Sequence, residues 1–206
     1  DVLGLKAGSY SVKVVPVDAA GKEIAGANTA TNLVVKSHNR EGFAHFNFEG
    51  IGAYNNDGTL KSDAKVLYIT ASTAKTVSTD VIVGSKNRKV NAKGFQAIIN
   101  AYQKGYDTTP IAFRIIGKVS LADLDGISSS SEGIQIKGKS GYSTMNMTFE
   151  GVGDDATVYG FGFLVRNSKS VEFRNFAIMR CLDDAMSLDT QNSNIWIHHM
   201  DTFYGK

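Results

Sequence analysis

The densest group of polar side chains falls in the stretch CLDDAMSLDTQNSNIWIHH, from Cys181 to His199. Within it, Asp183 and Asp184 are adjacent at an expected turn, just before an expected strand. Such a pair of carboxylates can supply oxygen ligands to Ca²⁺, or serve as the acid and the base of a glycoside hydrolase. An exposed turn that carries two carboxylates without a role is the third interpretation, and the residue types alone leave all three open.

Other chemistries find less support in the same stretch. Alternation along a strand should direct His198 and His199 to opposite faces, so the two rings are not expected to hold a zinc ion together. Cys181 is the one cysteine of the chain, which rules out an internal disulfide. No nucleophile-elbow motif accompanies a histidine and an aspartate, as a hydrolase triad of that type would require.

The elements around the acidic pair repeat with a period of 24 residues. The segments MNMTFEGV, SVEFRNFA and NIWIHHMD superpose at this step when Asn146 is aligned with Ser170 and Asn194. This alignment places Phe149, Phe173 and Ile197 in one column. At the same step, GFGFLV from Gly160 falls on DAMSLD from Asp184. Self-similarity of this kind is typical of stacked coils, and several short strands per coil favour a parallel β-helix. Two ordinary hairpins that align by chance are the competing interpretation.

Residue alternation predicts which side chains face the interior of the coils. The apolar column should point inward, whereas Glu172 and Trp196 should point outward. Glu150, Arg174 and His198 should form a second column on the outer face, with neighbours about 4.8 Å apart.

The rest of the chain predicts a strand-rich fold with one helix. Residues 1–36 contain two alternating strands, and residues 37–60 read as a polar loop rich in Gly, Asn and Asp. Three further strands are expected in KVLYIT, DVIVGS and PIAFRIIG. An amphipathic helix over residues 94–104 has apolar residues at i, i+3, i+4 and i+7, and it is well placed to cover the open apolar end of stacked coils.

Composition and charge exclude some classes of function. The 206 residues are 42% hydrophobic and 20% charged, which is ordinary for a globular protein, and the formal net charge is +2. So small a charge gives no strong attraction to nucleic acid, and the basic run at residues 85–89 is interpreted as a solvated loop. No apolar run approaches the roughly 20 residues of a membrane span. Neither a nucleic-acid partner nor a membrane span is therefore expected.

From about Gly42 to Lys206 the chain resembles bacterial pectate lyases of the right-handed parallel β-helix type. The matching stretches are GAYNNDGTLKSDAKVLYIT, GFQAIINAYQKG, MTFEGVGDDATVYGFGFLVRNSKSVEFRNFAIM and DDAMSLDTQNSNIWIHH. The stretch LKAGSYSVKVVPVDAAGKEIAG resembles the last two strands of a fibronectin type III domain. The expected organisation is an all-β chain. Residues 1–36 are a partial β-sandwich remnant, and residues 37–206 are the N-terminal, helix-capped part of a right-handed parallel β-helix.

The resemblance implies a secreted, extracellular enzyme that cleaves polygalacturonate or pectin by Ca²⁺-dependent β-elimination. Asp184 matches the family's first Ca²⁺-binding aspartate, and Asp183 is its neighbour in the expected metal site. His199 matches a histidine that usually follows the family's Trp-Ile pair. His198 is a departure, because the family commonly has an aspartate at this position.

The resemblance also implies that most of the active site lies beyond Lys206. The family's further Ca²⁺-binding acids, its catalytic arginine and a substrate-binding lysine all follow the Trp-Ile strand, so no catalytic residue is expected in this chain. We expect an internal piece of a larger lyase, inactive alone, whose partner could be the missing C-terminal half as a separate chain. A polygalacturonase-like β-helix hydrolase and a non-catalytic β-helix that binds polysaccharide are the alternatives.

Overall fold

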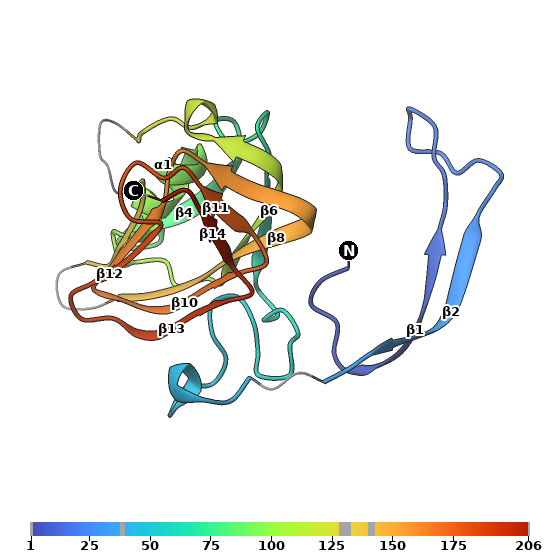
Figure 1. The fold of residues 1–206 in the computed structure, drawn as a ribbon, viewed down its shortest axis with the longest axis horizontal. Coiled ribbons are helices and arrows are strands. Elements are labelled where there is room, and N and C mark those ends of the chain that lie inside the picture. The colour runs from blue at the N-terminus through green and yellow to red at the C-terminus, as the bar shows by residue number, and fades with distance from the viewer. Residues whose placement is uncertain (1, 38–39, 128–132, 140–142, 206) are drawn as a thin grey trace.

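The computed structural model describes residues 2–37, 40–127, 133–139 and 143–205 (Figure 1). Strands dominate this part of the chain and most of them pair in parallel, which confirms the expected all-β class. The strands are β1 Gly8–Val14, β2 Asn28–Val35, β3 Lys65–Ile69, β4 Ser78–Gly84, β5 Arg88–Lys93, β6 Ile111–Ser120, β7 Ile134–Lys137, β8 Ser143–Tyr159, β9 Phe163–Arg166, β10 Ser168–Arg174, β11 Ala177–Met179, β12 Met186–Asp189, β13 Ser193–His198 and β14 Asp201–Phe203. The helices are α1 Phe95–Tyr102 and the short 3₁₀ helices η1 Phe43–His45 and η2 Leu121–Asp123.

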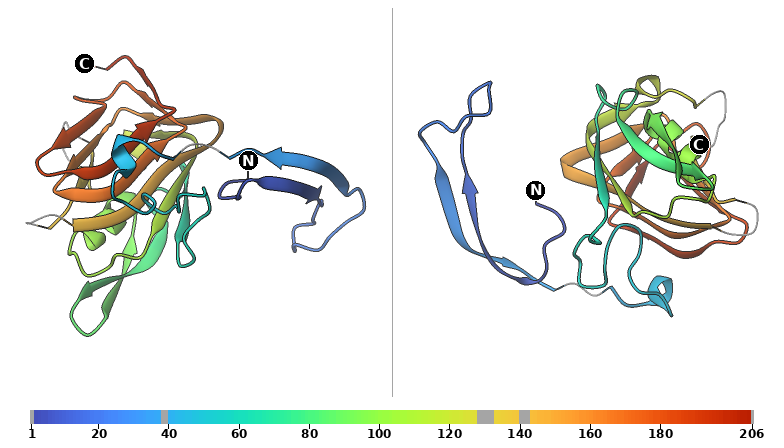
Figure 2. Two further views of the ribbon diagram at one scale, coloured as in Figure 1. Left: turned by 90° about the horizontal axis from the view of Figure 1, so that it is seen from below. Right: turned by 180° about the vertical axis from the view of Figure 1, so that it is seen from behind.

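The first two strands form a hairpin that extends away from the body of the molecule (Figures 1 and 2). β1 and β2 pair antiparallel, from Gly8 opposite Val35 to Val14 opposite Asn28. Both expected strands are present, but their apolar side chains are poorly covered, and Val14 and Val34 are each 65% exposed. A two-stranded sheet buries too little apolar surface to be stable alone in water, so the hairpin contributes little to the stability of the chain.

From β6 onward the chain passes repeatedly through three parallel layers. Two of them, which we call the first and second sheets, are parts of one seven-stranded sheet, and the third is a separate three-stranded sheet. In the first sheet, β3, β6, β8, β10 and β13 stack side by side in that order. The second contains the ends of β6 and β8 followed by β11 and β14, and the third consists of β7, β9 and β12. The colours in Figure 2 run from green through orange to red along this stack. Each passage returns the chain to the first sheet, one strand further along.

The 24-residue step is confirmed in the first sheet. Phe149 pairs with Phe173, and Phe173 pairs with Ile197. The rings of Phe149 and Phe173 are fully buried, with centroids 4.9 Å apart and planes only 10° from parallel. Phe113 of β6 adds another ring, 5.1 Å from Phe149. Ile197 is 36% exposed, because β13 is the last strand of this stack in the described structure.

The step in the third sheet is 23 residues, not the 24 expected from GFGFLV and DAMSLD, since Phe163 pairs with Met186. The extra residue is accommodated before β13, where Thr190 and Gln191 both have left-handed backbone conformations (φ 49° and 50°). A 24-residue step would pair Phe163 with Ser187 and turn that polar side chain toward the interior in place of Met186. Burial of the apolar residue therefore decides the register.

Left-handed backbone also recurs from coil to coil, at one position inside the strands of the first sheet and at the corner that follows them. Asn146, Ser170 and Asn194 have φ values of 50°, 63° and 53°, and Asn175 and His199 have values of 59° and 50°. Each set is spaced by 24 residues. Asparagine and histidine adopt this conformation more often than most residues, whereas Ser170 adopts it against its type. The repeat therefore extends to the corners as well as to the strands.

Helix α1 covers one end of the interior, as its apolar spacing predicts, although it ends two residues before the expected 104. Phe95, at its first turn, is almost completely buried. The Phe95 ring lies 5.1 Å from Phe113 and 6.0 Å from Phe149, so the helix packs against the side of the aromatic column. The antiparallel β4–β5 hairpin packs against the same helix.

Residues 40–61, which we call the arm, cover the outer face of the first sheet. The loop expected over residues 37–60 is present, but part of it is buried against this sheet. Ile51 and Tyr54 of the arm are fully buried. The backbone N–H of Ala53 donates to Thr148 Oγ1 of β8 at 3.0 Å. The arm has almost no regular secondary structure, and side chains of the sheet satisfy part of its backbone instead.

Candidate functional site

The acidic pair lies at the turn between β11 and β12. Asp183 and Asp184 are both exposed, and Asp184 Oδ2 accepts a hydrogen bond from Ser187 Oγ at 3.1 Å. The thiol of the buried Cys181 donates to the carbonyl oxygen of Asp183 at 3.2 Å. Both carboxylates are therefore in solvent at the side of the stack, where a hard cation can reach them.

Gly162 allows the backbone of this turn to approach the preceding coil. A Cβ atom at Gly162 would lie 2.2 Å from the carbonyl oxygen of Asp184 and 2.6 Å from that of Ala185. Phe163, the next residue, donates its N–H to the Ala185 carbonyl at 3.0 Å. The position of Asp184 therefore depends on a glycine one coil earlier.

A second cluster lies on the outer face of the first sheet, beneath the arm. Glu172 is fully buried there, and its Oε1 accepts a hydrogen bond from Arg40 Nη2 at 3.0 Å. The same oxygen lies 3.2 Å from His198 Nε2 and 3.7 Å from Arg174 Nη1. The other carboxylate oxygen, Oε2, accepts from Thr148 Oγ1 at 3.0 Å.

Glu150 is the other buried carboxylate of this cluster. Its oxygens accept hydrogen bonds from Tyr54 at 2.7 Å, from Arg114 Nε at 2.9 Å and from Arg174 Nη2 at 2.6 Å. Glu150, Arg174 and His198 pair in one column on the outer face, as expected, but the arm covers this face and buries the first two. A buried carboxylate is costly unless it is paired, so the arm supplies partners that solvent would otherwise provide. We call this set the charged layer: Arg40, Tyr54, Arg114, Glu150, Glu172 and Arg174.

The charged layer keeps Glu172 ionised. Burial alone would raise the pKa of Glu172, but the hydrogen bond with His198 and the positive charges of Arg174 and Arg40 outweigh it and hold that pKa below its usual value. Burial and the neighbouring Glu150 charge raise the pKa of Tyr54 to about 12. Tyr54 is therefore a neutral hydrogen-bond donor over the ordinary pH range.

His198 and His199 lie against each other, so the expectation that they face opposite sides is wrong. β13 ends at His198, and the left-handed backbone of His199 (φ 50°) interrupts the alternation. The two Nδ1 atoms are 2.7 Å apart. The His198 ring also stacks on Trp196, with centroids 3.6 Å apart. The 24-residue spacing from Asn175 to His199 was the signal in the sequence that position 199 is a corner.

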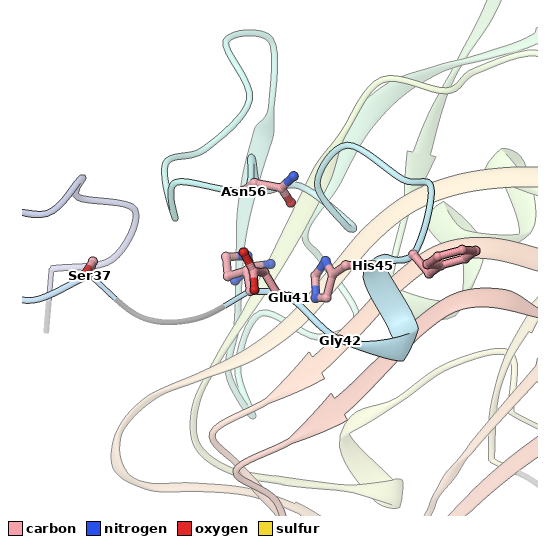
Figure 3. Close-up of a pocket in the computed structure, with 7 residues that line it drawn as sticks. Ser37, Glu41, Gly42, His45 and Asn56 are labelled. Carbon is pink, nitrogen blue, oxygen red and sulfur yellow. The ribbon is translucent and has the colours of Figure 1, made fainter.

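A cavity of about 680 Å³ opens beside the charged layer, at the start of the arm (Figure 3). It is lined by Ser37, Arg40, Glu41, Gly42, His45, Phe46 and Asn56. Figure 3 shows the Glu41 side chain next to the His45 ring, with Asn56 on another side of the cavity. Phe46 is 72% exposed, and Phe43 of η1 is completely exposed. Sequence analysis missed these residues, although phenylalanines in a segment otherwise interpreted as polar loop were the signal.

Comparison with models of known protein families gives no match, and no curated protein matches the chain. Within the described residues, no helix has the length and apolar character needed to span a bilayer. In the same part of the chain, no three or more His, Cys, Asp or Glu side chains are grouped so as to hold a metal ion. The fold and the site thus define a class: an all-β protein of stacked parallel strands, with an exposed acidic pair on one turn and a buried charged layer beneath its arm.

Proposed function

We propose that the stacked sheets are part of a right-handed parallel β-helix and that the protein is a secreted pectate lyase. Its substrate is polygalacturonate or pectin, which it cleaves by Ca²⁺-dependent β-elimination. The observation that carries the proposal is the exposed Asp183–Asp184 pair just before β12, on a coil that stacks in register on the preceding one. The resemblance of DDAMSLDTQNSNIWIHH to pectate lyases supports the role of Asp184, and Asp183 is its neighbour.

The donor atoms of the acidic pair fit calcium. Ca²⁺ takes roughly six to eight oxygen ligands, with carboxylates prominent among them, and Asp184 and Asp183 supply part of such a set. A bound Ca²⁺ would draw charge from a substrate carboxylate and so stabilise the negative charge that develops beside it. Within the chain, the hydroxyl of Ser187 orients the Asp184 carboxylate, and Gly162 lets the turn lie against the preceding coil.

The intact enzyme has to add further ligands and a base. Removal of the proton from C5 of a uronate needs a positioned base, and we assign no residue of this chain to that role. Residues 37–206 are then the N-terminal part of the lyase domain, and residues 1–36 a fibronectin type III-like remnant. On this proposal residues 1–206 alone bind the polymer but do not cleave it.

Ca²⁺-dependent binding to the polymer tests the proposal on the chain itself. Electrophoresis of residues 1–206 through gels that contain polygalacturonate should show a retardation that requires Ca²⁺ and disappears with a chelator. The Asp184→Asn variant should lose the Ca²⁺-dependent retardation in these gels. Asp154→Asn changes another exposed acidic pair and is the matched control, which should behave as the wild type. Equal Ca²⁺-dependent retardation of Asp184→Asn and wild type would remove Asp184 from the site.

In the intact enzyme, Asp184→Ala should raise the Ca²⁺ concentration needed for half-maximal activity, because one carboxylate ligand is lost. The ultraviolet absorbance of the unsaturated product measures the rate. Turnover that survives a chelator and yields no unsaturated product would point instead to a polygalacturonase-like hydrolase.

A second candidate is a β-helix that binds polysaccharide without cleaving it. The exposed rings of Phe43 and Phe46 favour it, since large exposed apolar groups next to a polar cavity often mark a binding surface. In that case Phe43→Ala should weaken the retardation in polygalacturonate gels regardless of Ca²⁺, and the intact protein should release no unsaturated product. If Phe43→Ala leaves the retardation unchanged, this candidate loses its support.

A further inference from the structure

The two histidines at the end of β13 bring two ring nitrogens close together. His198 Nδ1 and His199 Nδ1 are 2.7 Å apart, with the ring planes at 79° to each other. The left-handed conformation of His199 produces this approach, because continued strand geometry would place the rings on opposite faces. His199 is exposed, so the pair can be reached from solvent.

Glu172 fixes the orientation of His198. Its Oε1 lies 3.2 Å from His198 Nε2, and an ionised carboxylate accepts hydrogen bonds but cannot donate them, so Nε2 carries the proton. His198 Nδ1 is then the unprotonated nitrogen and presents its lone pair toward His199. Arg40 Nη2 holds the same carboxylate at 3.0 Å, and Trp196 stacks on the His198 ring. The imidazole of His198 is therefore held in one place and one tautomer.

We propose that His198 and His199 form a binding site for a divalent transition metal ion such as Cu²⁺ or Zn²⁺, with water at the remaining positions. Two imidazole nitrogens on one such ion, each about 2.0–2.1 Å from it, lie about 2.9–3.4 Å apart for bond angles between a right angle and the tetrahedral value. The observed separation of 2.7 Å has to widen by only a few tenths of an ångström. Because His198 is held in place, the exposed His199 ring has to turn aside so that the lone pairs of both Nδ1 atoms point to one ion.

The surroundings of His198 match those of metal-binding histidines in general. Such a histidine usually donates its other N–H to a carboxylate, which fixes the tautomer and makes the ligating nitrogen more basic. Imidazole suits copper, nickel and zinc, whereas Ca²⁺ prefers oxygen. The site therefore differs from the Asp183–Asp184 pair in both chemistry and place. Without a metal, the same geometry allows His199 to donate an N–H···N hydrogen bond to His198.

Titration with CuCl₂ tests the site. Residues 1–206 are titrated in a weakly coordinating buffer by calorimetry, and the complex is examined by electron paramagnetic resonance. We expect one bound Cu²⁺ with hyperfine structure from two nitrogens, which excess Ca²⁺ does not displace. His199→Asn keeps a residue that tolerates the left-handed backbone, so the fold should be retained. This variant should bind Cu²⁺ at least tenfold more weakly and lose the two-nitrogen pattern.

Two further variants locate the site. His38→Gln combined with His45→Gln removes the other two histidines of the chain and should leave Cu²⁺ binding unchanged; His38 lies outside the described residues. Glu172→Gln should weaken binding roughly 10- to 100-fold and alter the copper spectrum, as expected for a positioning residue. If this buried variant does not fold, His199→Asn decides the question.

Three results would overturn the proposal. The first is a wild-type protein without the two-nitrogen signal, and the second is a His199→Asn variant that binds Cu²⁺ as tightly as the wild type. The third is a proton on Nδ1 of His198 in the metal-free protein, detected by ¹⁵N nuclear magnetic resonance.

Discussion

At the scale of single residues, the aromatic column carries a large share of the stability. Phe173 is fully buried, with its ring 4.9 Å from Phe149 and 5.2 Å from Phe163. Phe173→Ala should lower the free energy of unfolding by about 3–5 kcal/mol, measured by urea denaturation. Phe43→Ala removes a completely exposed ring and should change the free energy of unfolding by less than about 0.5 kcal/mol. Equal losses from the two variants would contradict an internal column.

Gly162 links stability to the acidic pair. Gly162→Ala places a methyl group 2.2 Å from the Asp184 carbonyl oxygen, so the turn must move away from the preceding coil. We expect a loss of about 1–3 kcal/mol in unfolding free energy, together with weaker Ca²⁺-dependent retardation in polygalacturonate gels. Gly8→Ala is the control, because its Cβ would meet Tyr10 at an ordinary 3.6 Å. A Gly162→Ala variant with unchanged retardation would show that the turn is not held by this contact.

Residue types and alternation predicted some positions well and others poorly. Phe149 and Phe173 could be placed in the interior because apolar residues that alternate along a repeated strand all lie on one face, and that face is buried. His199 could not be placed, because strand alternation holds only while φ stays in the strand region and a corner residue breaks it. The outer face was predicted for Glu150 but its burial was not, because a sequence pattern shows which face of a sheet a residue occupies and not what covers that face.

At the scale of elements, the arm is held by its polar contacts with the first sheet. Tyr54→Phe removes the hydroxyl that donates to Glu150 and leaves part of a buried carboxylate unsatisfied. The variant should lose about 1–3 kcal/mol of unfolding free energy, and the amides of Ile51 and Tyr54, which bond to each other's carbonyls, should exchange faster. Tyr10→Phe loses only an exposed hydrogen bond to Lys6 and should show neither effect. Similar losses from both variants would mean that the arm does not depend on the charged layer.

Asp107 connects the β4–β5 hairpin to the parallel stack. Its Oδ2 accepts the N–H of Ile82 at 2.9 Å, its Oδ1 accepts that of Thr109 at 2.9 Å, and Lys65 Nζ lies 3.6 Å away. Burial alone would raise the pKa of Asp107, but these hydrogen bonds and the lysine charge outweigh it and hold the pKa below its usual value. The folded state therefore binds a proton at Asp107 less readily than the unfolded state does.

The sign of the pH dependence follows from this lowered pKa. Ionised Asp107 stabilises the fold fully above its unfolded pKa of about 3.9, and that contribution is lost as the pH falls through the lower folded value. Asp107→Asn should lower the unfolding free energy at neutral pH and flatten its decline below about pH 4. Denaturant titrations of both proteins over a pH series measure this. Parallel curves for wild type and variant would contradict the role of Asp107.

At the scale of the whole molecule, the repeat made the parallel stack predictable. The step between β10 and β13 followed from three aligned segments, whereas the 23-residue step between β9 and β12 did not. Two aligned segments do not show which corner contains an extra residue. In the structure, the packing of Met186 against the core decides the register of β9 and β12. The burial of the arm could not be predicted for a related reason. The arm has no sequence period of its own. Its conformation depends on contacts with residues about 100 positions away, such as the hydrogen bond from Ala53 to Thr148.

The last strands leave one end of the stack open. In the described structure β12, β13 and β14 each pair on one side only, and Leu188, Ile197 and Phe203 are 53%, 36% and 47% exposed on them. Unpaired strand edges next to apolar side chains promote association with other strands. Residues 1–206 should therefore associate with themselves and run above 22.2 kDa under native conditions.

A charge at the open end should oppose this association. Ile197→Lys places an ammonium group on β13, the edge of the first sheet. The native mass of this variant should therefore fall toward 22.2 kDa. Ile116→Lys is the matched control, because Ile116 is 38% exposed but lies on β6, away from the open end of the stack. It should leave the association unchanged. If wild type forms a single 22.2 kDa species both on a denaturing gel and by native mass measurement, the open end is tolerated in water and does not drive association.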